Sequence, residues 1–176
     1  MKRSYFSRSL AWVFIAVMPF WFGSCSKKDD AVAPSTSAIE GNWRISGYKV
    51  DPAIDFLGNG QKSNDLLAAL KSLPGGLGND AVECLTTTVV TFNSNGKITG
   101  KAGNKCDTSD DMNPIEENSS WRLDGNKLTI TSGSDVTTYD VVVSGNTLKL
   151  SAKETDDLDG DGKDETYTMT LEMTKA

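Results

Sequence analysis

Apolar and polar side chains alternate strictly over the last stretch of the sequence, 166–174. The apolar members are Tyr167, Met169, Leu171 and Met173, and each is followed by a polar residue, three threonines and one glutamate in all. Successive side chains of a strand point to opposite faces of a sheet, so this pattern predicts a strand with one buried and one solvated face. Similar alternation recurs upstream, which predicts an all-β fold of antiparallel strands.

Eight strands are expected along the chain, separated by turn residues. They cover about 42–50, 86–93, 97–102, 118–123, 127–133, 136–143, 147–154 and 166–174. The triplets Asp124-Gly125-Asn126 and Ser144-Gly145-Asn146 are typical of tight hairpin turns, and Asn93-Ser94-Asn95-Gly96 is a third turn signal. Such short connections predict a meander of neighbouring antiparallel strands.

One stretch, 64–76, departs from the strand pattern and predicts a helix. Its leucines recur at helical spacing and share one face; they are Leu66, Leu67, Leu70 and Leu73. Asn64 is expected to cap this helix, Asp65 suits the positive end of its dipole, and Pro74-Gly75-Gly76 is expected to end it. The helix lies between the first and second strands. It either plugs an open end of a barrel or forms a lid over a ligand, and the sequence leaves both open.

The N-terminal segment has the layout of a secretory signal peptide. Lys2, Arg3 and Arg8 supply a positive start, 10–22 is an unbroken apolar run, and two small residues precede Cys25. Thirteen apolar residues are too few to span a bilayer as a helix. We therefore expect 1–24 to be a cleaved signal for export.

Residues 22–25 resemble the lipobox of bacterial lipoproteins, although Phe22 stands where leucine is usual. The resemblance implies that Cys25 is lipidated and anchors the chain in the outer membrane, since each buried CH₂ adds about 0.8 kcal/mol of membrane affinity. The following 26–30 resemble the Lys/Asp-rich tag that directs some lipoproteins to the outer face of that membrane. They are otherwise the solvated start of a flexible tether covering 25–38.

Composition limits the function of the remaining domain, 39–176. The chain carries a net charge of −6, and without the three basic residues of 1–24 it carries −9, which argues against nucleic-acid binding. Histidine, the commonest general base and metal ligand, does not occur in the sequence. The acid pairs Asp110-Asp111 and Glu116-Glu117 fall in a polar loop where nothing raises a carboxyl pKa. We expect a protein that is not an enzyme and needs no cofactor.

The cysteines predict one disulfide. If Cys25 is acylated, Cys84 and Cys106 remain as an even pair in an oxidising location. Each lies eleven residues from Asn95, so a hairpin turning there places them nearly opposite one another. Closing a loop of this length stabilises the fold by roughly 3 kcal/mol in the chain-entropy treatment.

An acidic loop near the C-terminus has the oxygen spacing of a calcium site. The expected ligands are Asp157, Asp159 and Asp161 through their side chains, Lys163 through its carbonyl, and Glu165 directly or through water. Thr168 stands where an EF-hand has its bidentate glutamate, so the expected affinity is weak. The alternative is a solvated turn rich in Asp-Gly.

The start of the first strand, Ile39-Glu40-Gly41-Asn42-Trp43, carries a Gly-x-Trp signature, and 91–97, 120–123 and 145–150 agree with it. Together they resemble the short lipocalin-like domains of bacterial surface lipoproteins. The resemblance implies an eight-stranded up-and-down barrel with Trp43 packed across one end. The chain ends at its last strand, without the helix that follows it in larger secreted lipocalins.

The interior of such a barrel is either filled by side chains or holds one small ligand. Its expected lining includes Trp43, Trp121, Tyr167, Met169 and Met173. The leading hypothesis is capture of a small apolar or amphipathic ligand by an outer-membrane lipoprotein. The alternative is a surface interaction or structural module with a filled barrel and a calcium-stabilised loop.

Overall fold

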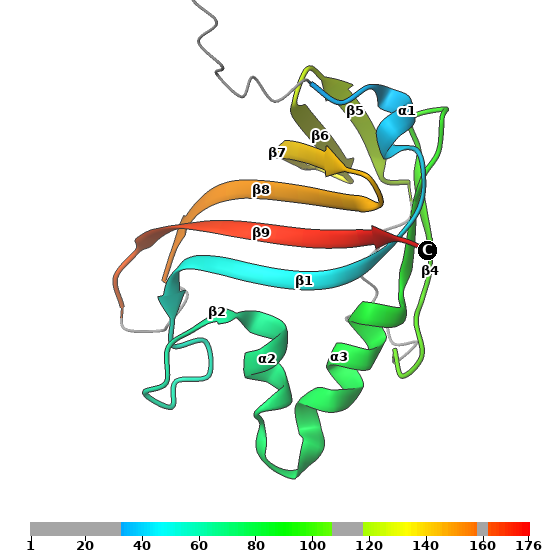
Figure 1. Cartoon of the computed structure of the whole chain (residues 1–176). Helices are drawn as coiled ribbons and strands as arrows, with labels where there is room; N and C mark the ends of the chain where they lie inside the picture. Colours follow the sequence, from blue (N-terminus) through cyan, green and yellow to red (C-terminus); the bar gives the residue numbers. More distant parts are fainter. Residues whose placement is uncertain (1–32, 107–117, 158–161) are drawn as a thin grey trace, which may run out of the picture. The chain divides into compact units, whose positions relative to one another are not determined.

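Eight antiparallel strands form a nearly closed barrel in the computed structural model, which describes residues 33–106, 118–157 and 162–176 (Figure 1). The strands are β1 (Gly41–Ile54), β3 (Val89–Phe92), β4 (Ile98–Lys101), β5 (Ser120–Asp124), β6 (Lys127–Ser132), β7 (Asp135–Ser144), β8 (Thr147–Asp156) and β9 (Glu165–Lys175). Their spatial order is β4-β3-β1-β9-β8-β7-β6-β5. The predicted all-β fold with eight meandering strands is confirmed.

The two edge strands of this sheet, β4 and β5, approach each other and nearly close the ring. An isolated bridge pairs Lys97 with Ser120. The Ile98 amide donates to the Ser119 carbonyl at 2.9 Å, and the Trp121 amide donates to the Gly96 carbonyl at 2.8 Å. Backbone groups that an open sheet would leave unpaired are satisfied at this seam.

The expected hairpin turns at 124–126 and 144–146 are confirmed. In each, two residues connect the strands, and the first of them is a glycine with positive φ: 59° at Gly125 and 57° at Gly145. Two-residue hairpin loops of this type need that left-handed conformation, which glycine adopts without steric cost. The second turn holds β7 and β8 in a register that sets Val143 opposite Leu148 and Val141 opposite Leu150.

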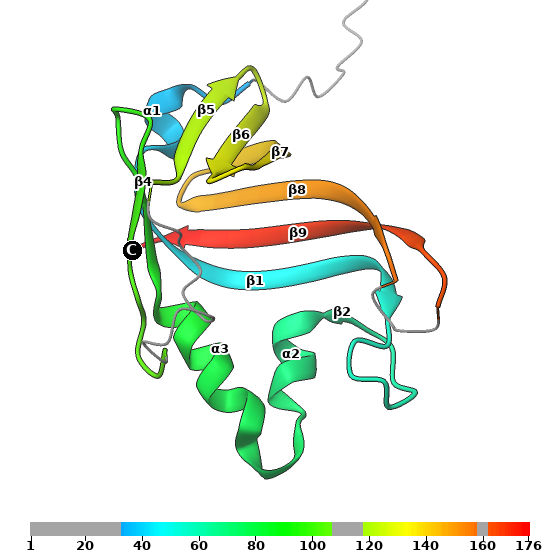
Figure 2. The same ribbon diagram turned by 180° about the vertical axis from the view of Figure 1, so that it is seen from behind.

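Two helices and a short strand cover the gap between β1 and β3. Pairing of β1 with β3 stops at Arg44, and further along β1 the partner is β2 (Ser63–Asp65). The helices α2 (Leu66–Lys71) and α3 (Leu77–Thr87) then lead the chain back to β3. Both lie alongside β1, as the two opposite views show (Figures 1 and 2). They therefore form part of the wall of the barrel.

The predicted short helix after the first strand is confirmed as α2, but the expected start and end of that helix are wrong. Asn64 lies in β2, and the cap is Asp65, whose Oδ1 accepts from the Ala68 amide at 2.9 Å. After α2, a single 3₁₀ turn, η1 (Pro74–Gly76), reverses the chain, and α3 begins directly afterwards. No helix in the described part of the chain is both long and apolar enough to cross a bilayer.

Helix α3 was not expected, and the strand predicted from residue 86 begins three residues later. Threonines favour strands because their branched side chains restrict helical rotamers. Here Thr86 and Thr87 donate instead to the carbonyls of Val82 and Glu83, four residues back, at 2.8 and 2.6 Å. The hydroxyls thus extend the helix into a sequence with strand character.

The predicted disulfide between Cys84 and Cys106 is confirmed, but the expected cross-strand arrangement is wrong. Cys84 lies in α3 and Cys106 lies beyond the end of β4. The fully buried Thr88 reinforces this link: its Oγ1 donates to the Cys84 carbonyl at 2.8 Å and accepts from the Gly103 amide at 3.0 Å. The disulfide fastens the end of α3 to the base of the β3–β4 hairpin.

One end of the barrel is sealed by Trp43 and the short helix α1 (Thr36–Ile39). The Trp43 indole is fully buried and its Nε1 donates to the Ile39 carbonyl at 2.6 Å. The Lys175 ammonium lies 5.3 Å from the centre of the indole ring, within range of a cation–π contact. Beside it, the rings of Phe92 and Trp121 pack edge to face with centroids 5.7 Å apart. Trp43 lies where the family resemblance implied.

Replacing both Cys84 and Cys106 by serine should lower the free energy of unfolding by about 2–4 kcal/mol, because the unfolded chain loses a cross-link. Urea unfolding followed by far-ultraviolet circular dichroism measures the change. Cys25→Ser is the matched control and should leave the midpoint unchanged. Equal stability of the double variant and the parent protein would contradict the role given to the disulfide.

Candidate ligand-binding cavity

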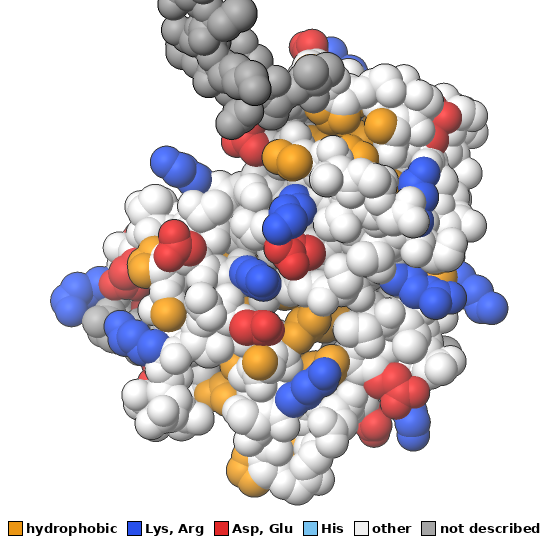
Figure 3. All heavy atoms as spheres, in the orientation of Figure 1, with side chains coloured by type: hydrophobic (Ala, Val, Ile, Leu, Met, Phe, Trp, Pro, Cys, Tyr) orange, Lys and Arg blue, Asp and Glu red, His pale blue; other side chains and the backbone are white. Residues whose placement is uncertain are grey.

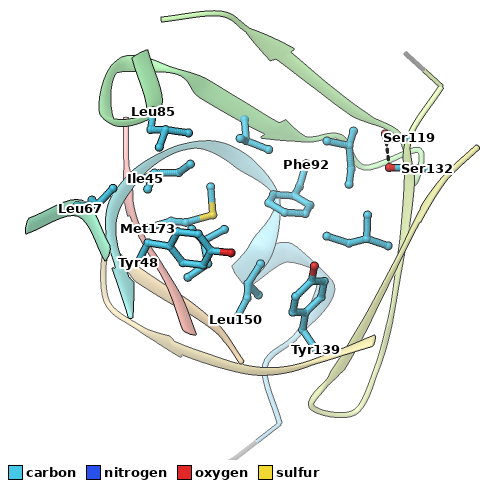
Figure 4. A pocket seen from close by; sticks show the side chains of 14 residues that line it. Ile45, Tyr48, Leu67, Leu85, Phe92, Ser119, Ser132, Tyr139, Leu150 and Met173 are labelled. Carbon is cyan, nitrogen blue, oxygen red and sulfur yellow. Dashed lines mark hydrogen bonds between the residues drawn. The ribbon is translucent and has the colours of Figure 1, made fainter. Parts of the chain in front are cut away.

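The barrel contains a cavity of about 430 Å³, here called the inner cavity. It is lined by Ile45, Tyr48, Leu67, Leu85, Val90, Phe92, Ile98, Ser119, Ile130, Ser132, Tyr139, Leu150, Leu171 and Met173. The strands supply most of this wall, while α2 contributes Leu67 and α3 contributes Leu85 (Figure 4). The volume falls within the range of about 300–1,000 Å³ that is typical of small-molecule sites.

The wall of the inner cavity is apolar except for four hydroxyl groups. Two of them, on Ser119 and Ser132, hydrogen-bond each other at 2.7 Å (Figure 4). Because these two hydroxyls already hydrogen-bond each other, an apolar ligand need not supply a hydrogen-bonding group to them. The other two belong to Tyr48 and Tyr139, whose rings point into the cavity. The inner cavity is therefore suited to an apolar group.

A second space of about 400 Å³, the outer cavity, adjoins the first. Its lining comprises Tyr48, Tyr139, Leu150, Ala152, Glu154, Tyr167, Met169 and Leu171. Four of these residues also line the inner cavity: Tyr48, Tyr139, Leu150 and Leu171. Along β8 the lining runs from the buried Leu150 to the exposed Glu154, so the outer cavity leads from the interior to solvent.

The tyrosines of the outer cavity are held in their neutral form. Burial is the main cause that raises the pKa of Tyr48 above its ordinary value of 10.0, and the neighbouring Tyr139, Tyr167 and Glu154 raise it further. Burial likewise raises the pKa of Tyr139, against the lowering effect of a hydrogen bond with Thr137. For Tyr167, burial and then the Asp156 and Glu154 carboxylates act in the same direction.

Charged side chains on the outside of β1, β8 and β9 pair with one another. Glu172 accepts from the Lys149 ammonium at 2.7 Å and lies 3.8 Å from that of Lys49. The hydrogen bond from Lys149 is the main reason that the pKa of Glu172 is lowered. Figure 3 shows acidic and basic side chains interspersed over this face, with hydrophobic ones in a hollow near α2, α3 and β1.

Of the five residues predicted to line the interior of the barrel, three line the cavities and two do not. Tyr167 and Met169 line the outer cavity, and Met173 lines the inner one. Trp43 and Trp121 are absent from both linings and belong to the hydrophobic core. The indole of Trp121 is directed elsewhere, since its Nε1 donates to the Asn93 carbonyl at 3.0 Å.

Sequence reasoning missed Tyr48, Tyr139 and Glu154 as lining residues. The alternation in 137–143 already placed Tyr139 on the same face as Val141, which was an available signal. Tyr48 was hidden because the β1–β9 register shifts between Ile45 and Gly47. A bulge of this kind moves every later side chain to the other face of the strand.

The expected calcium loop is only partly described. Asp159 and Asp161 lie outside the described residues, as do Cys25 and the export segment before it. Asp157 Oδ2 accepts from the Gly162 amide at 2.8 Å, whereas its Oδ1 is buried and has no hydrogen-bond partner in the described ranges. Within those ranges, no three acidic or cysteine side chains form a metal-binding group. Calcium binding stays a prediction.

The half-buried Tyr48 and Tyr139 predict a loss of stability at alkaline pH. Because the pKa values of Tyr48 and Tyr139 are raised on folding, their contribution is complete below about pH 10, where unfolded tyrosines ionise, and falls as the pH rises further. Tyr48→Phe should make this decline shallower. Urea unfolding between about pH 8 and about pH 11 measures it. The same slope in both proteins would contradict the expectation.

Comparison with known families agrees with this geometry. The family described as lipocalin-like domain matches residues 39–150, from the last residue of α1 into β8. No curated protein and no solved structure matches the chain significantly. The family match covers more than half of the sequence and includes the cavity-lining strands from β1 to the first part of β8, while β9 lies beyond it. The chain belongs to the family of lipocalin-like domains.

Proposed function

We propose that this protein binds a small apolar or amphipathic molecule inside its barrel, and that it acts by binding rather than by catalysis. The observation that carries the proposal is the inner cavity, about 430 Å³ in volume and walled almost entirely by apolar side chains. Moving apolar surface from water into such a site is favourable by roughly 25 cal/mol per Å². The barrel provides this environment without a change of fold.

Access supports a ligand that is apolar at one end and polar at the other. The end near Trp43 is closed by α1, whereas the outer cavity extends to the exposed Glu154. A molecule entering from that side buries its apolar part first. Its polar part then stays beside the tyrosine hydroxyls and the solvent.

We also propose that the domain acts at the outer membrane, on the basis of its N-terminal sequence. Residues 1–24 have the pattern of an export signal, and Cys25 ends a lipobox-like segment. Residues 26–30 support exposure at the cell surface. The tether up to residue 38 separates the barrel from the bilayer.

The second candidate is a surface interaction or structural module with a calcium-stabilised loop. One observation favours calcium, namely the buried Asp157 Oδ1 without a hydrogen-bond partner among the described residues. A buried carboxylate oxygen is costly unless it is paired or binds a metal. The proposed ligands remain Asp157, Asp159 and Asp161, with Lys163 and Glu165.

An uncharged apolar fluorophore, N-phenylnaphthylamine, should bind the protein saturably and fluoresce more strongly. Leu171→Trp places a larger side chain at the boundary of the two cavities. It should weaken binding of the fluorophore by about tenfold, because overpacking costs roughly 1–3 kcal/mol. Val142→Trp, at an exterior site on β7 that is 53% exposed, is the control and should bind like the parent protein.

Two outcomes of this titration count against the proposal. Failure of the parent protein to bind the probe favours the module with a filled barrel. Equal binding by Leu171→Trp and the parent protein places the probe outside the cavity. Thermal unfolding of both variants establishes that they are folded under the conditions of the titration.

Native mass spectrometry of protein purified from its own host tests the anchor and the metal together. The mature chain should begin at Cys25 and carry the added mass of acyl chains, which Cys25→Ser should abolish. A calcium adduct should disappear with a chelator and be absent from Asp157→Asn. An unmodified Cys25 contradicts the anchor, and a mass unaffected by chelator contradicts calcium binding.

A further inference from the structure

We propose that the ligand carries a cationic head group, an amine or a quaternary ammonium, which lies in the outer cavity between the tyrosine rings and the Glu154 carboxylate. Its apolar part occupies the inner cavity. This inference rests on the proposed function, since it names the chemistry of the molecule bound there. It follows from the charge and the aromatic character of the outer cavity.

The position of Glu154 is fixed by the strand register. It belongs to the row of β8 that also presents Leu150 and Ala152 to the cavities, and it lies opposite Tyr167 on β9. Neighbouring Lys153 belongs to the other face of the strand, opposite Thr168. A carboxylate therefore follows Leu150 and Ala152 on the inward row of β8, at the point where that row reaches the outer end of the cavity.

Three aromatic rings line the same space. Tyr167 is 5% exposed, while Tyr48 and Tyr139 are half-buried and lie at the boundary with the inner cavity. The faces of such rings carry negative potential and attract ammonium groups. The Glu154 carboxylate is close enough to raise the pKa values of all three hydroxyls. The three rings and the Glu154 carboxylate thus line the same part of the outer cavity.

The charge of this region excludes an anionic head group. Neither cavity has a lysine or arginine among its described lining residues. The tyrosines stay neutral near neutral pH, so Glu154 is the charged group of the lining, and Asp156 adds a second negative charge near Tyr167. A carboxylate ligand would face this charge without a compensating cation. An ammonium would gain from both the carboxylate and the rings.

Competition against bound N-phenylnaphthylamine by three matched amphiphiles, each below its micelle-forming concentration, tests the head group. Decyltrimethylammonium should bind about tenfold more tightly than decanoate, with decanol between them, as expected for a partly exposed carboxylate and aromatic rings. Glu154→Gln should weaken binding of the ammonium by about three- to tenfold and leave decanol unchanged.

Glu83→Gln is the matched control, because it makes the same chemical change at an exposed position of α3 and removes the same charge. It should leave all three affinities unchanged. Equal affinity for the three amphiphiles, or equal loss in both variants, overturns the cationic head group while barrel binding stands. Failure of the fluorophore itself to bind overturns the proposed function instead.

Discussion

The hydrogen bond from the Trp43 indole to the Ile39 carbonyl seals one end of the barrel, and the cavity depends on that seal. It joins α1 to β1, while Lys175 brings the end of β9 over the same ring. A barrel open at both ends would expose its apolar interior to water from two directions. With this end closed, the interior is accessible from the side of Glu154, and the apolar and polar parts of the lining follow one another along β8.

The second constraint is the incomplete pairing of β1 with β3. Hydrogen bonding between these strands stops at Arg44, and the wall continues through the side chains of α2 and α3. Buried Leu67 and Thr88 hold the two ends of this segment, and the disulfide from Cys84 fixes its return to the sheet. Together the sealed end and the helical wall explain why an eight-stranded barrel of this length retains an interior space.

Local alternation was sufficient to predict the eight strands and their hairpin turns, because burial of one sheet face determines residue type at every second position. It was insufficient where the backbone breaks that period. The register shift after Ile45 turns Tyr48 inward, and counting in twos from Trp43 places it outside. Helix α3 was missed because its threonines favour strands. It was missed also because the pairing of Cys84 with Cys106 was attributed to a longer hairpin, whereas the β3–β4 hairpin starts at Val89 and Cys84 lies in the helix before it. The cavity needs all these elements together, so no single segment of sequence reveals it.

The helical wall has a consequence for how such a domain diversifies. Strands in a ladder exchange backbone hydrogen bonds with both neighbours, so altering their spacing disturbs the whole ring. Leu67 and Leu85 reach the cavity from helices whose backbone bonds are internal. Substitutions at these two positions can therefore reshape the pocket while the strand ladder stays intact. Ligand specificity is accordingly expected to evolve through this side of the barrel.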